Sequence, residues 1–255
     1  ILTMSIPGLS EIFCPFPQVS GLYFMWQVMF FPSLAMADGP NLKWAPNLAA
    51  SWDISADSRF YTFYIQPDAV WSDGVPITAD DVAYSFTLWL DPDIGTADLT
   101  MIKGGADYRS GKASSVSGIK VIDDKTIEFE METPTGLFIG KVGKYVLPLG
   151  VFPKHIVDKI VPADMSKSEW CRRPKVSGGP FILQAAVPGQ FVQLVANETY
   201  WFGRPKIDQI VMPVIKSEDA RVIAFLREDL ILPYRGGPPK EVYDDLLKDP
   251  RFNAA

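Results

Sequence analysis

Paired carboxylates are the side chains of this 255-residue sequence whose type and spacing could support acid–base chemistry. They include three Asp-Asp pairs, namely Asp80-Asp81, Asp123-Asp124 and Asp244-Asp245. Two adjacent carboxylates can divide the roles of acid and base when their surroundings separate their pKa values. Here each pair falls at a predicted helix start, in a turn or on a helix face, where carboxylates cap the backbone or face water. We therefore expect none of the three pairs to be catalytic.

Other residues that catalysis or metal binding would need are scarce. His155 is the only histidine, which argues against a metal site built from histidines and against a Ser-His triad. The sequence has no glycine-rich phosphate loop, no Cys/His metal spacing and no Gly-x-Ser-x-Gly nucleophile motif. We therefore expect a protein that is not an enzyme and that holds no cofactor and no metal.

Charge and composition limit the class of partner. The formal net charge is −6 and no run of Lys and Arg offsets it, so the chain would repel nucleic acid and anionic membranes. With 47% hydrophobic and 21% charged residues it can bury a core, as one large domain or two small ones. These values predict a globular protein that binds no nucleic acid.

The stretch between Glu11 and Asp38 contains no charged residue, which raises the question of a membrane-spanning helix. Prolines and polar side chains interrupt this apolar run, namely Pro15, Pro17, Gln18, Ser20, Gln27 and Pro32. We therefore expect a loop over residues 12–20, a buried helix over 21–30 and an extended piece through residue 37.

Residues 71–82 form the stretch around which the other elements are organised. Asp73-Gly74 predicts a turn, because glycine accepts the positive φ that other residues resist. Thr78 followed by Asp81 predicts a helix N-terminus, with a carboxylate in the first turn near unpaired N–H groups. Apolar residues then recur at helical spacing through the segment 83–90, at Val82, Phe86, Trp89 and Leu90.

The remaining elements alternate between strands and helices. Strands are predicted over residues 1–6, 48–54, 60–66, 118–122, 126–131, 181–186, 191–196 and 207–215. Helices are predicted over residues 135–146, from 153, over 164–171, from a Ser217 cap to 227 and over 241–247. This pattern indicates an α/β protein with mixed sheets flanked by helices.

The residue order Trp-Ser-Asp-Gly-x-Pro-x-Thr-Ala-x-Asp-Val in the segment 71–82 resembles the signature of the extracellular solute-binding proteins of family 5. These are the peptide-, nickel- and opine-type receptors of ABC importers. Two further segments are similar to landmarks of that family, one from Pro46 to Phe63 and one that joins Gly178-Gly179-Pro180-Phe181 to the residues from Asn197 to Pro205. The similarity extends from about residue 20 to residue 250.

The resemblance implies a periplasmic-binding-protein-like α/β fold of type II, in which a small lobe is inserted into a large one. Residues 1–45 and 169–232 would belong to the large lobe, 46–168 to the small lobe, and 233–255 to the hinge and the start of a second lobe. Arg227-Glu228-Asp229-Leu230 stands where the family has Gly-Glu-Ile-Asp, without its glycine. We expect the chain to cover about half of a family member.

The resemblance also implies a function: capture of a small solute, most simply a peptide, between two lobes that close by a hinge, and its delivery to an ABC transporter permease. The protein would be an exported monomer of the periplasm or cell surface, with or without a lipid anchor. Ligand contacts are expected from three loops, at Gln18, Ser20, Tyr23, Tyr145, Leu149, Tyr234, Arg235 and Gly236. Arg235 would hold a ligand carboxylate through its planar guanidinium.

Two other functions remain open at this stage. An oligosaccharide receptor of the same fold would use aromatic residues to line the cleft, and a hydrolase would need a nucleophile and a base. Cys14 and Cys171 also leave two possibilities, since an exported protein could join them in one disulfide or keep two buried thiols.

Overall fold

The structure is a computed structural model that describes residues 1–8, 12–14, 23–39, 43–143 and 149–233. The chain divides into two compact units. The first contains Ile1–Glu11, Leu183–Val195 and Lys206–Ala255, and the second contains Ile12–Ile182 and Ala196–Pro205. The lobe boundaries expected from the sequence refer to a complete two-lobed protein, and they stay a prediction.

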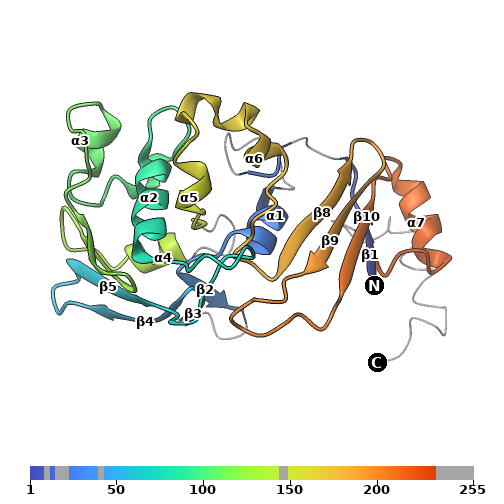
Figure 1. Cartoon of the computed structure of the whole chain (residues 1–255), viewed down its shortest axis with the longest axis horizontal. Coiled ribbons are helices and arrows are strands. Elements are labelled where there is room, and N and C mark those ends of the chain that lie inside the picture. Colours follow the sequence, from blue (N-terminus) through green and yellow to red (C-terminus); the bar gives the residue numbers. More distant parts are fainter. Residues whose placement is uncertain (9–11, 15–22, 40–42, 144–148, 234–255) are drawn as a thin grey trace. The chain divides into compact units, whose positions relative to one another are not determined.

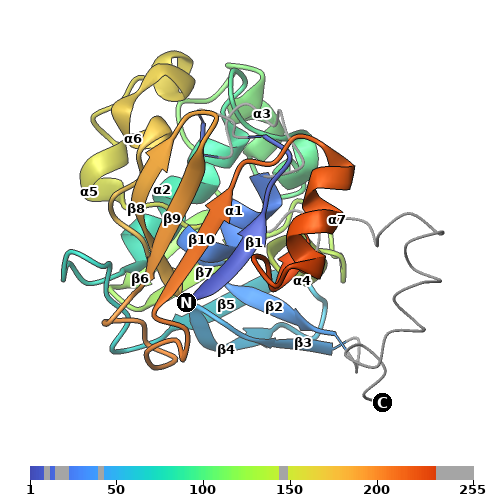
Figure 2. The ribbon, with the colours of Figure 1, turned by 90° about the vertical axis from the view of Figure 1, so that its right-hand side faces the viewer.

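The first unit is built on a five-stranded mixed sheet (Figure 2). Its strand order is β11 (Leu232–Pro233), β1 (Leu2–Ser5), β10 (Gln209–Pro213), β9 (Phe191–Ala196) and β8 (Phe181–Val187). The β1 strand is parallel to both β10 and β11, whereas β9 and β10 are antiparallel. Alternating buried residues on β9 and β10 follow the two-residue period of a strand. Strands were expected at all of these places except β11.

The helix α7 (Glu218–Leu226) follows β10 along the chain, and its labelled ribbon lies beside β1 in Figure 2. Ser217 caps it as expected, because the Ser217 side chain accepts a hydrogen bond from the Ala220 N–H at 3.3 Å.

The second unit contains a four-stranded antiparallel sheet in the order β4 (Ala49–Ile54), β5 (Phe60–Ile65), β7 (Thr126–Glu130) and β6 (Ile119–Asp123). The helix α2 (Ala79–Leu90) packs against β6 and β7 (Figure 1). Four buried phenylalanines fill the space, with ring centroids 4.7 Å apart for Phe86 and Phe129 and 5.1 Å apart for Phe129 and Phe138. The fourth is Phe63. The four strands and the helix confirm the sequence prediction.

Shorter elements complete this unit. They are α1 (Tyr23–Phe30), β2 (Ala35–Asp38), β3 (Lys43–Pro46), η1 (Ala97–Leu99), α3 (Gly105–Arg109), α4 (Phe138–Val142), α5 (Lys154–Val157), η2 (Pro162–Lys167) and α6 (Glu169–Arg172). The single helix predicted over 164–171 is wrong. It is divided at Ser168, whose backbone is extended and whose hydroxyl accepts a hydrogen bond from the Cys171 N–H at 3.1 Å, which starts α6. The helix predicted over 135–146 begins later, at Phe138.

The apolar segment near the N-terminus becomes the core of the second unit. Trp26 and Phe30 of α1 are fully buried, and a disulfide joins Cys14 to Cys171 with a Cα–Cα distance of 4.7 Å. The Phe13 N–H donates to the Cys171 carbonyl at 2.8 Å beside it. Within the described residues there is no candidate for a membrane-spanning helix.

Candidate functional site

The turn at the start of the 71–82 stretch has the geometry that its sequence predicts. Gly74 has a φ of 87°, and its N–H donates to the Trp71 carbonyl at 2.8 Å. The Trp71 N–H in turn donates to the Val75 carbonyl at 2.8 Å, and the Trp71 side chain is fully buried. The chain then continues from this turn to Thr78, the N-cap residue of α2.

Asp81 is the polar centre of this region and is only 5% exposed. Its Oδ2 accepts hydrogen bonds from the Thr78 N–H at 2.9 Å, the Thr78 hydroxyl at 3.3 Å and the Trp71 indole N–H at 3.4 Å. Its Oδ1 accepts from the Lys154 N–H at 2.9 Å. A buried carboxylate with these partners fixes the backbone that donates to it. The expected capping role is therefore present, and it extends to a segment 73 residues away.

Asp81 is the first of three α2 side chains, spaced four residues apart, that hydrogen-bond to every second residue of the segment 150–154. The three bonds run from the Lys154 N–H to Asp81 at 2.9 Å, from the Phe152 N–H to Ser85 Oγ at 2.8 Å, and from Trp89 Nε1 to the Gly150 carbonyl at 2.9 Å. Four residues of helix rise about 6 Å, close to the about 6.6 Å that two residues of extended chain advance. Because the two spacings are nearly equal, side chains on one face of α2 can bond to alternate residues along the segment 150–154.

A second contact joins the signature turn to α5. His155 Nε2 lies 2.9 Å from Asp73 Oδ2, and both side chains are 32% exposed. Lys154 Nζ lies 3.6 Å from the exposed carboxylate of Asp80. The only histidine is thus a partly exposed residue near a helix start, as expected, and no cluster of metal-binding side chains occurs among the described residues.

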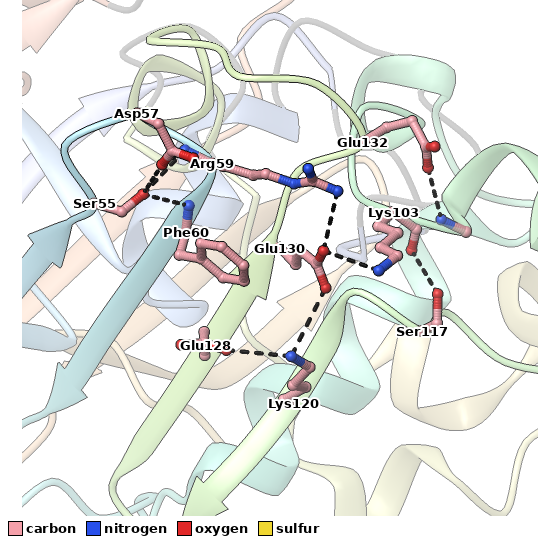
Figure 3. Close-up of polar contacts among 11 residues, drawn as sticks. Ser55, Asp57, Arg59, Phe60, Lys103, Ser117, Lys120, Glu128, Glu130 and Glu132 are labelled. Atoms are coloured by element: carbon pink, nitrogen blue, oxygen red, sulfur yellow. Dashed lines mark hydrogen bonds and ion pairs between the residues drawn. The ribbon is translucent and has the colours of Figure 1, made fainter.

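Another polar cluster surrounds Glu130, where β5 and β7 meet the 101–104 loop (Figure 3). One carboxylate oxygen lies 2.9 Å from Lys103 Nζ and 3.3 Å from Arg59 Nη2, and the other lies 3.7 Å from Lys120 Nζ. The hydrogen bond from Lys103, and then the charges of the neighbouring cations, lower the pKa of Glu130. An ionised carboxylate held in this way cannot donate a proton, so its role is to join strands.

The second sequence landmark is also built from backbone contacts. Asn197 is 1% exposed, its side-chain amide donates to the Gly179 carbonyl at 2.9 Å, and its N–H donates to the Pro180 carbonyl at 2.9 Å. A Cβ added to Gly179 would lie 2.2 Å from the Met29 carbonyl oxygen. The glycine therefore permits the close approach of α1.

The predicted ligand contacts are mostly outside the part of the chain that the structure describes. Those residues are Gln18, Ser20, Tyr145, Tyr234, Arg235 and Gly236. Tyr23 is the first residue of α1, and Leu149 is 5% exposed, directly before the segment that α2 holds. The role of these eight residues stays a prediction.

Sequence reasoning missed the functions of Ser85 and Trp89. We assigned Trp89 to an apolar face, and we gave Ser85 no role. The signal was present, because Asp81 and Ser85 are polar residues on the same side of the helix as a buried tryptophan. Polar side chains at such positions need partners inside the protein.

Comparisons with known proteins agree with this geometry. The family described as bacterial extracellular solute-binding proteins, family 5 Middle, matches residues 43–252. A putative ABC transporter peptide-binding protein of Brucella ovis is 27% identical over 220 residues, which cover 86% of this chain and 38% of that protein. The dipeptide-binding protein DppE of Bacillus subtilis is 30% identical over 215 residues, which cover 82% of this chain and 37% of that protein.

A solved structure is similar along nearly the whole chain. It is a periplasmic oligopeptide-binding protein of Borrelia burgdorferi, with a TM-score of 0.82 and 26% identity, covering 98% of this chain and 49% of that one. The chain thus spans less than half the length of the relatives that it matches. The expected α/β fold of the periplasmic binding proteins is confirmed. Because the family match spans most of the sequence, the chain belongs to the bacterial extracellular solute-binding proteins of family 5.

Proposed function

We propose that this chain is part of a peptide receptor of an ABC importer. The receptor binds a peptide between two lobes, closes on it by a hinge and delivers it to a membrane permease, and no bond of the peptide changes. It acts as a monomer outside the cytoplasm, in the periplasm or at the cell surface. It is not an enzyme.

The observation that carries this proposal is the family match over residues 43–252. The relatives' names add the substrate class, since the Brucella protein is called peptide-binding and the Bacillus protein dipeptide-binding. These names favour a peptide over an oligosaccharide, and they do not favour a hydrolase. The carboxylates of Asp81 and Glu130 are buried and bonded to other groups of the chain, so neither is available for hydrolysis.

The ligand contacts proposed are the three loops predicted from the sequence. Gln18, Ser20 and Tyr23 belong to the first, Tyr145 and Leu149 to the second, and Tyr234, Arg235 and Gly236 to the third. In this proposal the Arg235 guanidinium binds the C-terminal carboxylate of the peptide through two hydrogen bonds. Arg235→Lys should then weaken peptide binding by about 1–3 kcal/mol, the cost of leaving a hydrogen-bonding group without its partner.

Calorimetry on the complete protein, meaning this chain with any sequence that continues it, tests the proposal. The probes are dialanine, trialanine, a nonapeptide of mixed sequence, cello-oligosaccharides and xylo-oligosaccharides. We expect heat of binding from at least one peptide and from none of the sugars. Binding of a sugar alone would favour the oligosaccharide receptor, and release of free amino acids from the peptides would show a hydrolase.

A further inference from the structure

The Cys14–Cys171 disulfide joins two parts of the second unit that are 157 residues apart in sequence. Both cysteines are buried, with Cys14 3% exposed and Cys171 fully buried. The Cys171 carbonyl also accepts hydrogen bonds from the Phe13 N–H at 2.8 Å and from the Cys14 N–H at 3.3 Å. One covalent bond and two hydrogen bonds therefore hold the segment 12–14 on α6.

Each of the two cysteines follows an aromatic residue of the core. Phe13 packs on Trp26 with ring centroids 4.9 Å apart, and Trp170 packs on Phe31 and Phe152 at 5.5 and 5.7 Å. All five rings are buried. The disulfide thus closes a long loop and fixes an aromatic residue at each of its ends. A bond that closes a long loop removes much of the conformational freedom of the unfolded chain.

We propose that this disulfide is a redox gate on the folding of the second unit. The bond does not persist in the reducing cytoplasm, and until it closes the segment 12–14 does not stay docked on α6. A receptor that crosses a membrane before it folds benefits from such a gate, because its core is completed only on the oxidising side. This benefit rests on the proposed function, which places the receptor outside the cytoplasm.

The oxidant that closes the gate is a disulfide carried by an exchange partner. One thiolate of this chain attacks that disulfide, which forms a mixed disulfide and releases one thiolate of the partner. The second thiolate of this chain then attacks its own cysteine in the mixed disulfide, which forms the Cys14–Cys171 bond and releases the partner's other thiolate. The two thiols of this chain lose two protons and two electrons, and the partner's disulfide is reduced to two thiols. Because both cysteines are buried in the folded chain, the exchange has to precede closure of the core.

Reduction of the folded chain is the first test. Dithiothreitol should release the two thiols only as fast as the core opens, so urea below the unfolding midpoint should speed the release strongly. A thiol-reactive dye added to quenched samples measures this rate. If the folded chain without urea is reduced as fast as the urea-unfolded chain, the gate is overturned.

Hydrogen exchange at the Phe13 amide is the second test. The oxidised chain is compared with chain that is reduced in urea and returned to buffer containing dithiothreitol. We expect the Phe13 amide to exchange about 30-fold faster or more in the reduced chain, the ratio that the lower end of a disulfide's usual contribution gives. Equal protection of this amide in the two forms would refute the gate.

A double variant with Cys14→Ala and Cys171→Ala is the matched control for the reductant. Its Phe13 amide should exchange as fast as that of the reduced chain, and at the same rate with and without dithiothreitol. Protection of this amide in the double variant equal to that in the oxidised parent would show that the segment 12–14 docks without the disulfide, and the gate would be wrong.

Calorimetry on the oxidised complete protein, with dialanine, trialanine and the nonapeptide, separates the gate from the proposed function. If no peptide binds, the receptor function is refuted, and the gate is still decided by the exchange rates at Phe13. If a peptide binds and the Phe13 amide is equally protected in the oxidised and reduced forms, the gate alone is refuted.

Discussion

Replacing Asp81 with alanine removes the acceptor that joins the signature turn, the N-terminus of α2 and the start of α5. Four groups would lose it: the N–H and the hydroxyl of Thr78, the Lys154 N–H and the Trp71 indole N–H. Hydrogen bonds to a charged group contribute about 1.5–3 kcal/mol each. The two bonds at 2.9 Å therefore account for at least about 3 kcal/mol, and the Trp71 bond at 3.4 Å adds less. Removal of a buried charge offsets part of this loss.

We therefore expect Asp81→Ala to lower the free energy of unfolding by about 2–4 kcal/mol. Urea unfolding of the chain, followed by circular dichroism, measures this loss. Asp80 is the matched control, because it is a carboxylate in the same first turn, but its side chain is 62% exposed and pairs only with Lys154 Nζ at 3.6 Å among the described residues. Asp80→Ala should change the free energy of unfolding by no more than about 0.5 kcal/mol. Equal losses in the two variants would refute the assignment of Asp81 as the buried centre.

Three further changes test other parts of the second unit. Gly179→Ala should destabilise the fold by about 3 kcal/mol in the same urea assay, because the new Cβ would lie 2.2 Å from a backbone carbonyl oxygen of α1. Gly136→Ala is the control, since a Cβ at Gly136 has open space around it, and it should be nearly neutral. Opening the Cys14–Cys171 disulfide with Cys171→Ser should lower the free energy of unfolding by about 2–5 kcal/mol, and an unchanged urea midpoint would contradict this. Because the pKa of Glu130 lies below its ordinary 4.5, its ionised form stabilises the fold above that pH, and the stabilisation is lost as the pH falls through the lower value. Glu130→Gln should therefore lose less stability than the parent on acidification below pH 4.5, as measured by thermal melts across that range.

Local patterns were enough to predict most elements of this fold. The Asp73-Gly74 turn, the α2 cap and the β6–β7 hairpin depend on residues close together in sequence, so their backbone chemistry is visible there. Long-range partners are not visible in this way. Lys125 lies in the turn between β6 and β7, and its ammonium group donates to the Gln66 and Ile77 carbonyls. Burial lowers the pKa of Lys125, against the effect of nearby carboxylates. Nothing local to the turn indicates where that side chain points.

The division of the segment 164–171 shows a different limit. Its composition suits one short helix, but a serine that can cap a helix can also interrupt one. The Ser168 hydroxyl accepts the capping hydrogen bond from the Cys171 N–H, so a new helix starts there. Cys171 is also fixed by the disulfide. The sequence contains both options, and tertiary contacts that a local pattern does not encode decide between them.

The candidate site was harder to predict than the fold, and the motifs themselves show why. Trp71, Asp81, Gly179 and Asn197 identify the family, and each of them is buried or bonded to the chain's own backbone. Residues with that duty support the scaffold, because removing one of them lowers its stability. The choice of ligand must then depend on residues outside the motifs, and a motif match cannot report it. The proposed contact residue Arg235 should accordingly discriminate between peptides with and without a free carboxylate.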